Sequence, residues 1–310
     1  MTNEGGRFTQ AVMVDAMHEI ARQLGVTATA DAQLLRLTNN AVFALPTAGL
    51  VIRIVRSVVL HARVAKVVRL AQWFAEIEAP TVRLLTSVGQ PLRVGDLSAT
   101  VWHYVPPSLS SPSVSDLGRS LRQFHSLGAP PFPLPQWDPV REARTRLADA
   151  ESLSDEQRAV LLDWCGRLAP RLAALNRRAG GGLLHGDAHA GNLVRGPDGH
   201  VLLCDFDPTC LGPWQFDLVP TAVGEQRFGR EGTHRALAEA YGYDVTADPD
   251  WPLLREAREL KMITGVLSYL GSTPGVAEEF TIRLRSVVEG DEMARWRPYA
   301  EFGVAGRKPC

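Results

Sequence analysis

The sequence predicts an α+β fold of two lobes, with an antiparallel-sheet N-lobe at residues 1–105 and a mostly helical C-lobe at residues 106–310. Two observations lead to this prediction. Short strand-like runs follow an opening helix in the first third of the chain, and helical periodicity dominates after a Pro-Pro and serine-rich stretch that begins at Pro106. With 310 residues, 45% of them apolar, the chain can bury one large core or two smaller ones.

The N-lobe is predicted to begin with a helix at residues 8–24, where apolar side chains recur at helical spacing and Gly25 follows as a stop signal. A second helix, inserted after the third strand, is expected at 58–74. The strands are expected at 34–37, 41–45, 50–55, 81–85, 92–94 and 99–105.

The C-lobe is predicted to be built mainly from amphipathic helices. They are expected at 113–127, 138–150, 154–178, 215–223, 233–241, 252–270 and 276–288. The proline-rich run at 129–135 is short and carries an aromatic residue, so we interpret it as a rigid connector between two of these helices.

The most informative feature is the run HGDAHAGN, which begins at His185, followed by DFD at Asp205. The spacing Asp-x-x-x-x-Asn and then a further Asp is typical of phosphoryl-transfer enzymes. Apolar pairs on both sides of a Pro-Asp-Gly turn at 197–199 predict a loop and then a short hairpin. This places Asp205 at the exit of the hairpin.

Three residues of this motif are candidates for chemistry. Asp187 is the expected catalytic carboxylate, which orients the acceptor hydroxyl and receives its proton. Asn192 and Asp205 offer the hard oxygen ligands that Mg²⁺ prefers. Each residue alone is also typical of a surface turn, but together at this spacing they favour a functional site.

Neighbouring polar residues allow two interpretations each. His185 and His189 are either proton acceptors or structural hydrogen-bonding groups, and the second is favoured because Asp187 already suits the role of base. Asp217 either reaches back to the backbone of the catalytic loop or caps the helix that follows it.

HGDAHAGN, CDFD and the later GPWQFDL resemble the aminoglycoside phosphotransferase family of small-molecule kinases, which is choline kinase-like. The resemblance covers about Leu34 to Val223. It implies a bilobal protein-kinase-like fold, Mg²⁺, and ATP or GTP as phosphoryl donor. It also implies that Asp187 is the base, that Asn192 and Asp205 bind the metal, and that Asp217 and His185 stabilise the loop.

The expected cation of the nucleotide site is Arg53, because LVIR at residues 50–53 stands where the family has a strand ending in lysine. Period-two alternation turns Arg53 toward the cleft, where a guanidinium can clamp phosphates. The helix at 57–75 contains no acid to pair with it. Either the partner comes from elsewhere, or none is needed, or activity is lost. Candidate acids elsewhere are Asp15, Glu19, Glu76 and Glu78.

The remaining nucleotide contacts are expected in two loops. Residues 38–40 (TNN) occupy the first hairpin in place of a glycine-rich loop, and Asn40 resembles the Asn of the family there. By the same resemblance, backbone groups near His103 and Val105 bind the adenine. The aromatic residues Trp102 and Tyr104 either pack around the base or belong to the core.

Charge and cysteine content restrict the partners. The net charge of −1 gives no long-range field for nucleic acid or an anionic membrane, and no transmembrane segment is expected. The four cysteines show no metal or redox spacing, and Cys204 and Cys210 are expected to be small buried residues. The N-terminus lacks an apolar signal core. We therefore expect a reduced, cytoplasmic protein; the sequence does not predict its oligomeric state.

The acceptor is less well defined. From Gln215 to the C-terminus there are fifteen Asp and Glu against twelve Lys and Arg, which is only mildly acidic for a site that binds polycations. The acceptor is therefore an aminoglycoside, or equally a nucleoside, sugar, amino alcohol or less cationic antibiotic. The predicted function is an ATP- or GTP-dependent phosphotransferase acting on a small hydroxylated molecule. A catalytically weakened kinase-like nucleotide-binding or regulatory protein is the alternative, and a protein kinase is a weaker one.

Overall fold

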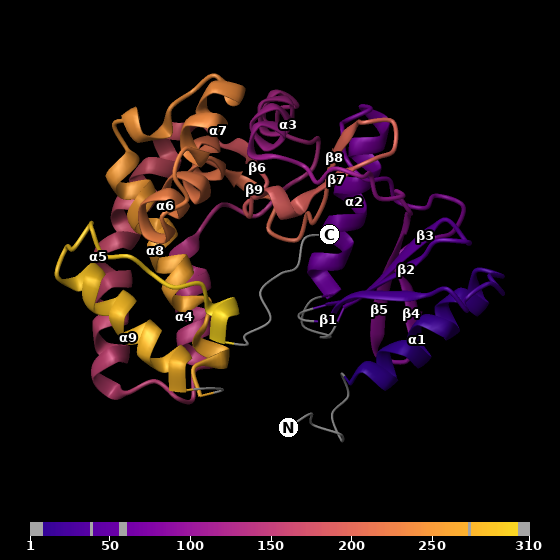
Figure 1. Cartoon of the computed structure of the whole chain (residues 1–310), viewed down its shortest axis with the longest axis horizontal. Coiled ribbons are helices and arrows are strands. Elements are labelled where there is room, and N and C mark those ends of the chain that lie inside the picture. Colours follow the sequence, from indigo (N-terminus) through magenta and orange to yellow (C-terminus); the bar gives the residue numbers. More distant parts are fainter. Residues whose placement is uncertain (1–8, 38–39, 56–60, 272–273, 303–310) are drawn as a thin grey trace. The chain divides into compact units, whose positions relative to one another are not determined.

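The computed structural model describes residues 9–37, 40–55, 61–271 and 274–302, and the chain forms two compact units (Figure 1). The first unit combines the chain up to Pro112 with the internal segment Gly191–Asp207. The second contains Ser113–Ala190 and the chain from Pro208 onward. The predicted α+β class is confirmed, whereas the lobe boundary at residue 105 stays a prediction.

The first unit is built around a five-stranded antiparallel sheet with the order β1-β2-β3-β5-β4. Its strands are β1 (Gln33–Leu37), β2 (Asn40–Leu45), β3 (Leu50–Val55), β4 (Leu92–Val94) and β5 (Leu97–His103). Two helices belong to the same unit: α1 (Gln10–Gln23) and α2 (His61–Glu76). These elements match the predicted ones within a few residues at each end.

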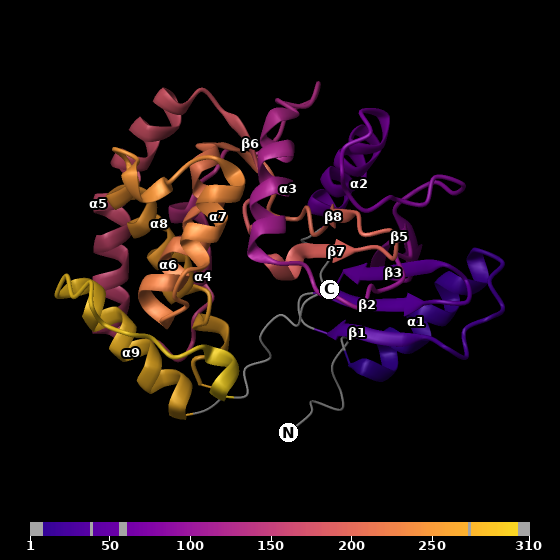
Figure 2. The same ribbon diagram turned by 45° about the horizontal axis from the view of Figure 1, so that its top comes forward.

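Helix α1 packs on one face of this sheet (Figure 2). Met13, Met17 and Ile20 share one side of the helix and are fully buried in the same core cluster as Ile52 and Ile54 of β3. Side chains alternate between the faces of a strand, so the residue between these two isoleucines lies on the opposite face. That residue is Arg53.

The strand predicted at 81–85 is wrong. Thr81 and Leu84 form only isolated bridges, one to Leu203 and one to Trp102. The hydrogen bonds of this segment change partner along its length: the N–H of Val82 donates to Leu203, while the N–H of Leu85 donates to Val101. A regular ladder needs one continuous partner strand, which this segment does not have.

The predicted hairpin is present within the first unit. It consists of β7 (Leu193–Arg195) and β8 (Val201–Leu203), paired so that Leu193 faces Leu203. Gly199 lies in the connecting turn with φ +83°, in the left-handed region that favours glycine.

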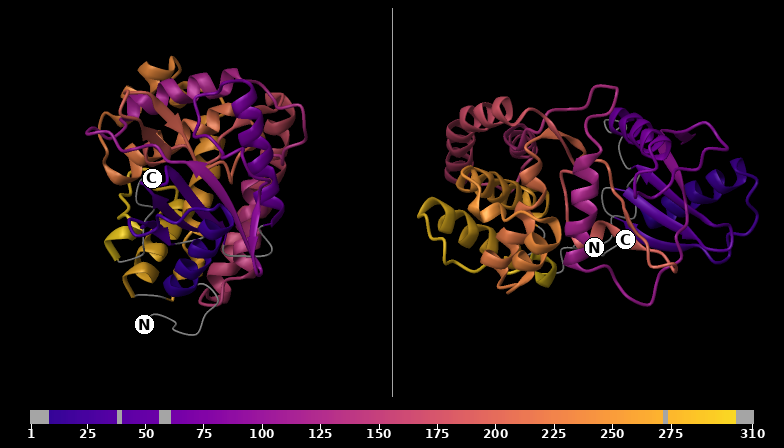
Figure 3. Two further views of the ribbon diagram at one scale, coloured as in Figure 1. Left: turned by 90° about the vertical axis from the view of Figure 1, so that its right-hand side faces the viewer. Right: turned by 90° about the horizontal axis from the view of Figure 1, so that it is seen from above.

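The second unit is mostly helical, and Figure 3 shows it from two further directions. Its main elements are α3 (Val114–Ser126), α4 (Pro139–Ala148), α5 (Asp155–Ala179), α6 (Val219–Phe228), α7 (Thr233–Tyr241), α8 (Trp251–Thr264) and α9 (Pro274–Val288). Strands β6 (Gly182–Leu184) and β9 (Cys210–Gly212) form a separate antiparallel pair. Capping boxes at Ser113 and Ser154 begin α3 and α5.

Two predicted helices are divided. The helix expected at 215–223 is a 3-10 helix, η3 (Trp214–Asp217), followed by α6, whose first turn contains Pro220. Proline lacks an N–H, so it is tolerated where a helix begins but not in its interior. The helix expected at 252–270 ends at Thr264, before Gly265, and a 3-10 helix η5 (Leu267–Tyr269) follows.

Within the described part of the chain, no helix combines the length and apolar character needed to cross a bilayer. Cys165, Cys204 and Cys210 are buried and form no disulfide, and burial agrees with the expectation for the last two.

Candidate functional site

The hairpin of the first unit brings Asn192 and Asp205 to the same end of the β7–β8 ladder. Asn192 directly precedes β7, and its carbonyl accepts a hydrogen bond of 2.9 Å from the N–H of Cys204. Asp205 is the next residue, with φ +68°, a conformation that aspartate tolerates better than most residues. Asn192 is fully buried. We call residues 205–207 the acidic segment.

The first carboxylate of the acidic segment pairs with an arginine. Arg36 on β1 donates from Nη1 to Oδ2 of Asp205 over 3.3 Å, and the two side chains are 11% and 13% exposed. Partial burial of both groups strengthens such a pair relative to a surface one. Arg36 had no predicted role.

The second carboxylate of the acidic segment pairs with Arg53. The guanidinium of Arg53 forms an ion pair with Oδ2 of Asp207, and the amide of Asn40 lies 3.5 Å from the same oxygen. Sequence reasoning named Asp207 only as part of the DFD motif and gave it no role. The hairpin therefore supplies an acid that pairs with Arg53, and Asp207 is not among the four acids considered from the sequence.

Helix α2, which carries no acid until Glu76, supplies a cation to the same residue. The Nζ of Lys66 donates to the backbone carbonyl of Asp207 over 2.6 Å. Asp207 is thus held through its side chain by strand β3 and through its backbone by α2. Arg53 and Lys66 therefore both contact Asp207.

The middle residue of the acidic segment anchors it in the core. Phe206 is buried, with its ring 4.9 Å from that of Phe74 on α2 and 6.4 Å from that of Trp102 on β5. The indole N–H of Trp102 donates to Thr100 over 2.9 Å. Trp102 is therefore a core residue, the second of its two sequence interpretations.

The segment predicted to contact adenine has part of its backbone already engaged. The N–H of His103 donates to Arg83, and that of Tyr104 donates to Gly49. The side chain of His103 is exposed and Val105 is half-buried. In the predicted phosphate loop, Thr38 and Asn39 lie outside the described residues.

In the second unit, the segment His185–Asp187, here called the HGD loop, is bound by the carboxylate of Asp217. One oxygen accepts from the N–H of His185 at 2.6 Å and the other from the N–H of Gly186 at 2.9 Å. Leu218 occupies the N-cap position of α6 and provides no side-chain cap. Asp217 thus contacts the loop backbone rather than capping the helix.

Asp217 is completely buried and is also bound by a histidine. The Nε2 of His125 lies 3.0 Å from its carboxylate, and the Nδ1 of His125 lies 2.9 Å from the hydroxyl of Tyr241. Burial by itself raises the pKa of Asp217, but the hydrogen bond and charge of His125 and the backbone donors outweigh it and lower the pKa. Burial and the charge of Asp217 raise the pKa of Tyr241. Sequence reasoning missed His125 and Tyr241.

Gly186 holds the HGD loop in a conformation that only glycine fits. Its φ is +83°, and a Cβ there would lie 2.4 Å from the carbonyl oxygen of Pro208. The carbonyl of Gly186 accepts a hydrogen bond of 2.7 Å from Nζ of Lys261 on α8. Lysine 261 had no predicted role, and no local sequence signal identifies it.

The proposed catalytic residue, Asp187, is buried at 8% exposure. The Nε2 of His189 lies 3.8 Å from Oδ2 of Asp187. The backbone N–H of Asp187 lies 3.4 Å from Nδ1 of His185. The ring of His185 is fully buried and meets Phe124 edge-on. His185 therefore has a packed, structural environment, whereas His189 is the histidine beside the Asp187 carboxylate.

The oxygen donors of the first unit suit Mg²⁺. Among the described residues, no three His, Cys, Asp or Glu side chains cluster as a complete metal cage. Mg²⁺ is usually bound through one or two carboxylates together with substrate phosphates rather than by such a cage. Asp205 and the amide oxygen of Asn192 fit that mode.

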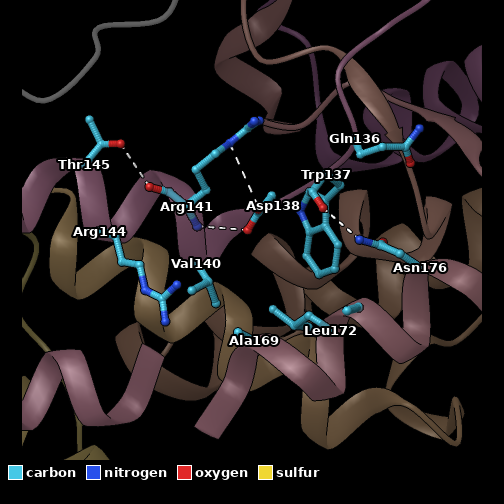
Figure 4. A pocket seen from close by; sticks show the side chains of 11 residues that line it. Gln136, Trp137, Asp138, Val140, Arg141, Arg144, Thr145, Ala169, Leu172 and Asn176 are labelled. Atoms are coloured by element: carbon cyan, nitrogen blue, oxygen red, sulfur yellow. Dashed lines mark hydrogen bonds and ion pairs between the residues drawn. The ribbon is translucent and has the colours of Figure 1, made fainter. Parts of the chain in front are cut away.

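A separate cavity of about 700 Å³ lies between α4 and α5 of the second unit (Figure 4). Trp137, Val140 and Leu172 form part of its wall, with Arg141 and Arg144 also lining it. None of the predicted site residues lines this cavity, so it is distinct from the HGD loop.

The comparisons with known proteins agree with this fold. The model of the phosphotransferase enzyme family matches residues 32–257. No curated protein sequence matches the chain significantly.

Solved structures with the same fold include a choline/ethanolamine kinase family protein from Mesorhizobium loti, with 16% identity, 91% of this chain and 96% of that chain covered, and a TM-score of 0.61. The aminoglycoside phosphotransferase APH(3'')-Id from Streptomyces rimosus has 19% identity, coverage of 80% and 98%, and a TM-score of 0.59. The choline kinase LicA from Streptococcus pneumoniae has 13% identity, coverage of 90% and 98%, and a TM-score of 0.61.

Proposed function

Because this chain belongs to the phosphotransferase enzyme family, we propose that it transfers the γ-phosphoryl group of ATP or GTP to a hydroxyl of a small molecule. The observation that supports this most directly is the HGD loop. Asp187 follows a glycine whose N–H and carbonyl are both fixed, by Asp217 and by Lys261. A carboxylate held in this way costs little reorganisation during reaction.

In the proposed reaction, the acceptor hydroxyl oxygen forms a new bond to the γ-phosphorus while the bond from the γ-phosphorus to the β,γ-bridging oxygen breaks. The hydroxyl proton passes to the Asp187 carboxylate, and ADP or GDP leaves with the bridging oxygen. Asp187 orients the hydroxyl as well as accepting its proton. His189 lies beside this carboxylate, with its Nε2 3.8 Å from Oδ2 of Asp187.

The nucleotide side of the proposal uses the first unit. Arg53 and Asn40 are assigned to the phosphates, and backbone groups near His103 and Val105 to the base. Asn192 and Asp205 are assigned as the Mg²⁺ ligands, and the ion when bound supplies charge neutralisation on the phosphates. Arg36 and Arg53 contact the acidic segment, so they hold its two carboxylates in place. Their guanidinium groups also put two positive charges beside these carboxylates.

Structural neighbours provide support for the donor and the acceptor classes. LicA has been solved with AMP, APH(2'')-IIIa with GDP and kanamycin, and APH(9)-Ia with ADP and spectinomycin. These are properties of those proteins. For this chain we propose a purine nucleotide as donor and a hydroxylated small molecule, including antibiotics such as aminoglycosides or nucleosides, as the acceptor class.

The test is transfer of labelled γ-phosphate from ATP and GTP, with Mg²⁺, to a panel of hydroxylated antibiotics, sugars, amino alcohols and hydroxy acids. Asp187→Asn should lower the transfer rate by about 10²-fold to 10⁴-fold, the usual contribution of a positioned base. Asp198→Asn is the matched control, since Asp198 is an exposed aspartate in the hairpin turn. Transfer that survives unchanged in Asp187→Asn would contradict the assignment.

The alternative, nucleotide binding without transfer, rests on the missing helix acid and on an arginine where the family has a strand lysine. Asp207 provides an acid for Arg53, which removes the first of these two motivations. Tight nucleotide binding with no detectable transfer, and no slow hydrolysis of ATP, would restore the alternative.

A further inference from the structure

Helix α8 places a row of polar residues next to the HGD loop. Arg258, Lys261 and Thr264 are spaced by three residues and so lie along one side of the helix. The row meets the loop at Lys261, whose Nζ donates to Gly186, the residue before Asp187. The row of polar residues therefore reaches the backbone next to the proposed catalytic carboxylate.

A third cation reaches this row from α4. Arg146 lies 3.5 Å from the hydroxyl of Thr264 through Nη1, and 3.5 Å from the carboxylate of Glu142 through Nη2. Helices α4 and α8 are packed together along this side. We call Arg146, Arg258 and Lys261 the basic cluster. Glu142 pairs with Arg146 and opposes the lowering of the Lys261 pKa, as Cys210 also does.

Within the described chain, Arg258 is the member of the basic cluster whose charge is not paired. No described carboxylate forms an ion pair with it, and its buried Nε has no hydrogen-bond partner there. The other acids of α8 are engaged on different sides: Glu256 with Arg171, and Glu259 with Arg227. An excess of buried positive charge is costly unless a partner compensates it.

The titration of these groups agrees with that geometry. Burial, with a further contribution from Arg146, lowers the pKa of Arg258 to about 10. Burial also lowers the pKa of Lys261, with Glu142 opposing and both arginines adding to the shift. Both side chains nevertheless keep some exposure to solvent. They are thus strongly desolvated and still partly accessible to solvent.

We propose that the basic cluster binds a carboxylate or phosphate group of the acceptor, so that the substrate is a hydroxylated anion. The inference rests on the proposed phosphotransferase function and specifies its substrate class. Guanidinium groups match carboxylate and phosphate oxygens with paired donors, which favours Arg146 and Arg258 as the contacts. A polycationic aminoglycoside would meet like charge at this position.

The anionic group takes no part in bond making. It orients the acceptor, whose hydroxyl oxygen then attacks the γ-phosphorus as described above, with the proton passing to Asp187 and the nucleoside diphosphate leaving. Binding of the anion and transfer to the hydroxyl are therefore separable measurements.

The test is a calorimetric titration of the full chain with glycerol, glycerate and glycerol 3-phosphate, which share a primary hydroxyl and differ in negative charge. The wild-type chain should bind the two anions more tightly than glycerol. Arg258→Gln should weaken binding of both anions by about tenfold or more, the usual effect of losing a charge-assisted hydrogen bond. The matched control is Arg235→Gln, because Arg235 on α7 is 81% exposed.

Arg146→Gln should repeat the loss, and Asp187→Asn should lower the transfer rate as stated above while keeping anion binding. Arg258→Gln should also unfold at a higher temperature than the wild type, because it removes an uncompensated charge, so a binding loss is not a folding defect. Equal anion affinity in Arg258→Gln and Arg235→Gln, or no anion binding by the wild type, overturns the proposal. So does anion binding that is lost in Arg53→Gln but kept in Arg258→Gln. If anion binding follows the basic cluster but no acceptor is phosphorylated, the proposed function fails and the anion site stands.

Discussion

Arg53 on strand β3 pairs with Asp207, a residue 154 positions later in the chain, on the face of the sheet opposite to α1. Asn40 and Lys66 contact Asp207 as well. The pair links the nucleotide-side strand to the segment that carries the proposed metal ligand Asp205. Its side chains are 12% and 27% exposed, so it is neither a fully buried nor a surface ion pair.

We expect the Arg53–Asp207 pair to couple in a double-mutant cycle. Arg53→Gln, Asp207→Asn and the double variant should show a coupling free energy of about 1–2 kcal/mol in urea unfolding, between surface and buried values. The exposed pair Arg235 and Glu239, at 4.0 Å, is the matched control and should couple by less than about 0.5 kcal/mol. If the two substitutions change the free energy of unfolding additively, the Arg53–Asp207 pair does not stabilise the fold.

Gly186→Ala should be much more damaging than Gly199→Ala. Both glycines have φ +83°, but a Cβ at Gly186 would lie 2.4 Å from a backbone oxygen, while nothing lies within 4 Å of one at Gly199. Gly199→Ala should cost about 1–2 kcal/mol from the left-handed conformation alone. Gly186→Ala should cost roughly 3 kcal/mol or more and abolish transfer. Equal losses in thermal unfolding would show that steric contact with Pro208 is unimportant.

Asp217→Asn should destabilise the chain in a pH-dependent way. The folded-state pKa of Asp217 is lowered, so the unfolded state binds more protons and the contribution to stability is complete above the unfolded pKa of about 4. It is lost as the pH falls through the folded pKa. The difference in free energy of unfolding between wild type and Asp217→Asn should be about 3 kcal/mol at neutral pH and should shrink below about pH 4.

Chemical denaturation of both proteins across this pH range measures the effect. Asp198→Asn, at an exposed turn position, should show no comparable trend. A difference that stays constant down to pH 3 would mean that Asp217 is not ionised in the folded state.

Two Lys→Met variants should distinguish an effect on phosphoryl transfer from an effect on nucleotide binding. Lys261 donates to Gly186 beside Asp187, and Lys66 donates to the carbonyl of Asp207, over 2.7 and 2.6 Å. Lys261→Met should lower kcat by about tenfold with little change in KM for the nucleotide, because an HGD-loop carbonyl loses its donor. Lys66→Met should mainly raise KM for the nucleotide. Steady-state kinetics with varied ATP would show this, and the same pattern in both variants would refute the division.

Periodicity and capping signals made much of the fold predictable. The alternation in β3 was used to assign Arg53 to one face of the strand, and the spacing of apolar residues predicted α7 at its observed bounds. The segment at 81–85 could not be assigned correctly, because its backbone partners change along its length. Strand β6 was also missed as a partner of β9, since each contributes only three residues.

The local motif made it possible to predict the candidate site residues and their order. The partners that these residues contact could not be predicted. Arg36 meets Asp205 across 169 residues of sequence, and Lys261 meets Gly186 across 75. Such pairs depend on which elements the fold brings together, and a single sequence carries no periodic signal for them. The acid for Arg53 was sought on α2 because the related families place it there. In this chain Asp207 provides it.

The segment Gly191–Asp207 belongs to the first unit although both sequence neighbours belong to the second. The first unit is therefore not encoded by one continuous stretch of sequence. A truncated product ending at Pro112 would keep Arg36 and Arg53 but would lose Asp205, Asp207 and the aromatic anchor Phe206. Such a product should be poorly folded by itself. It should recover when a peptide spanning 191–207 is supplied in trans, which would make this protein a candidate for split-protein complementation.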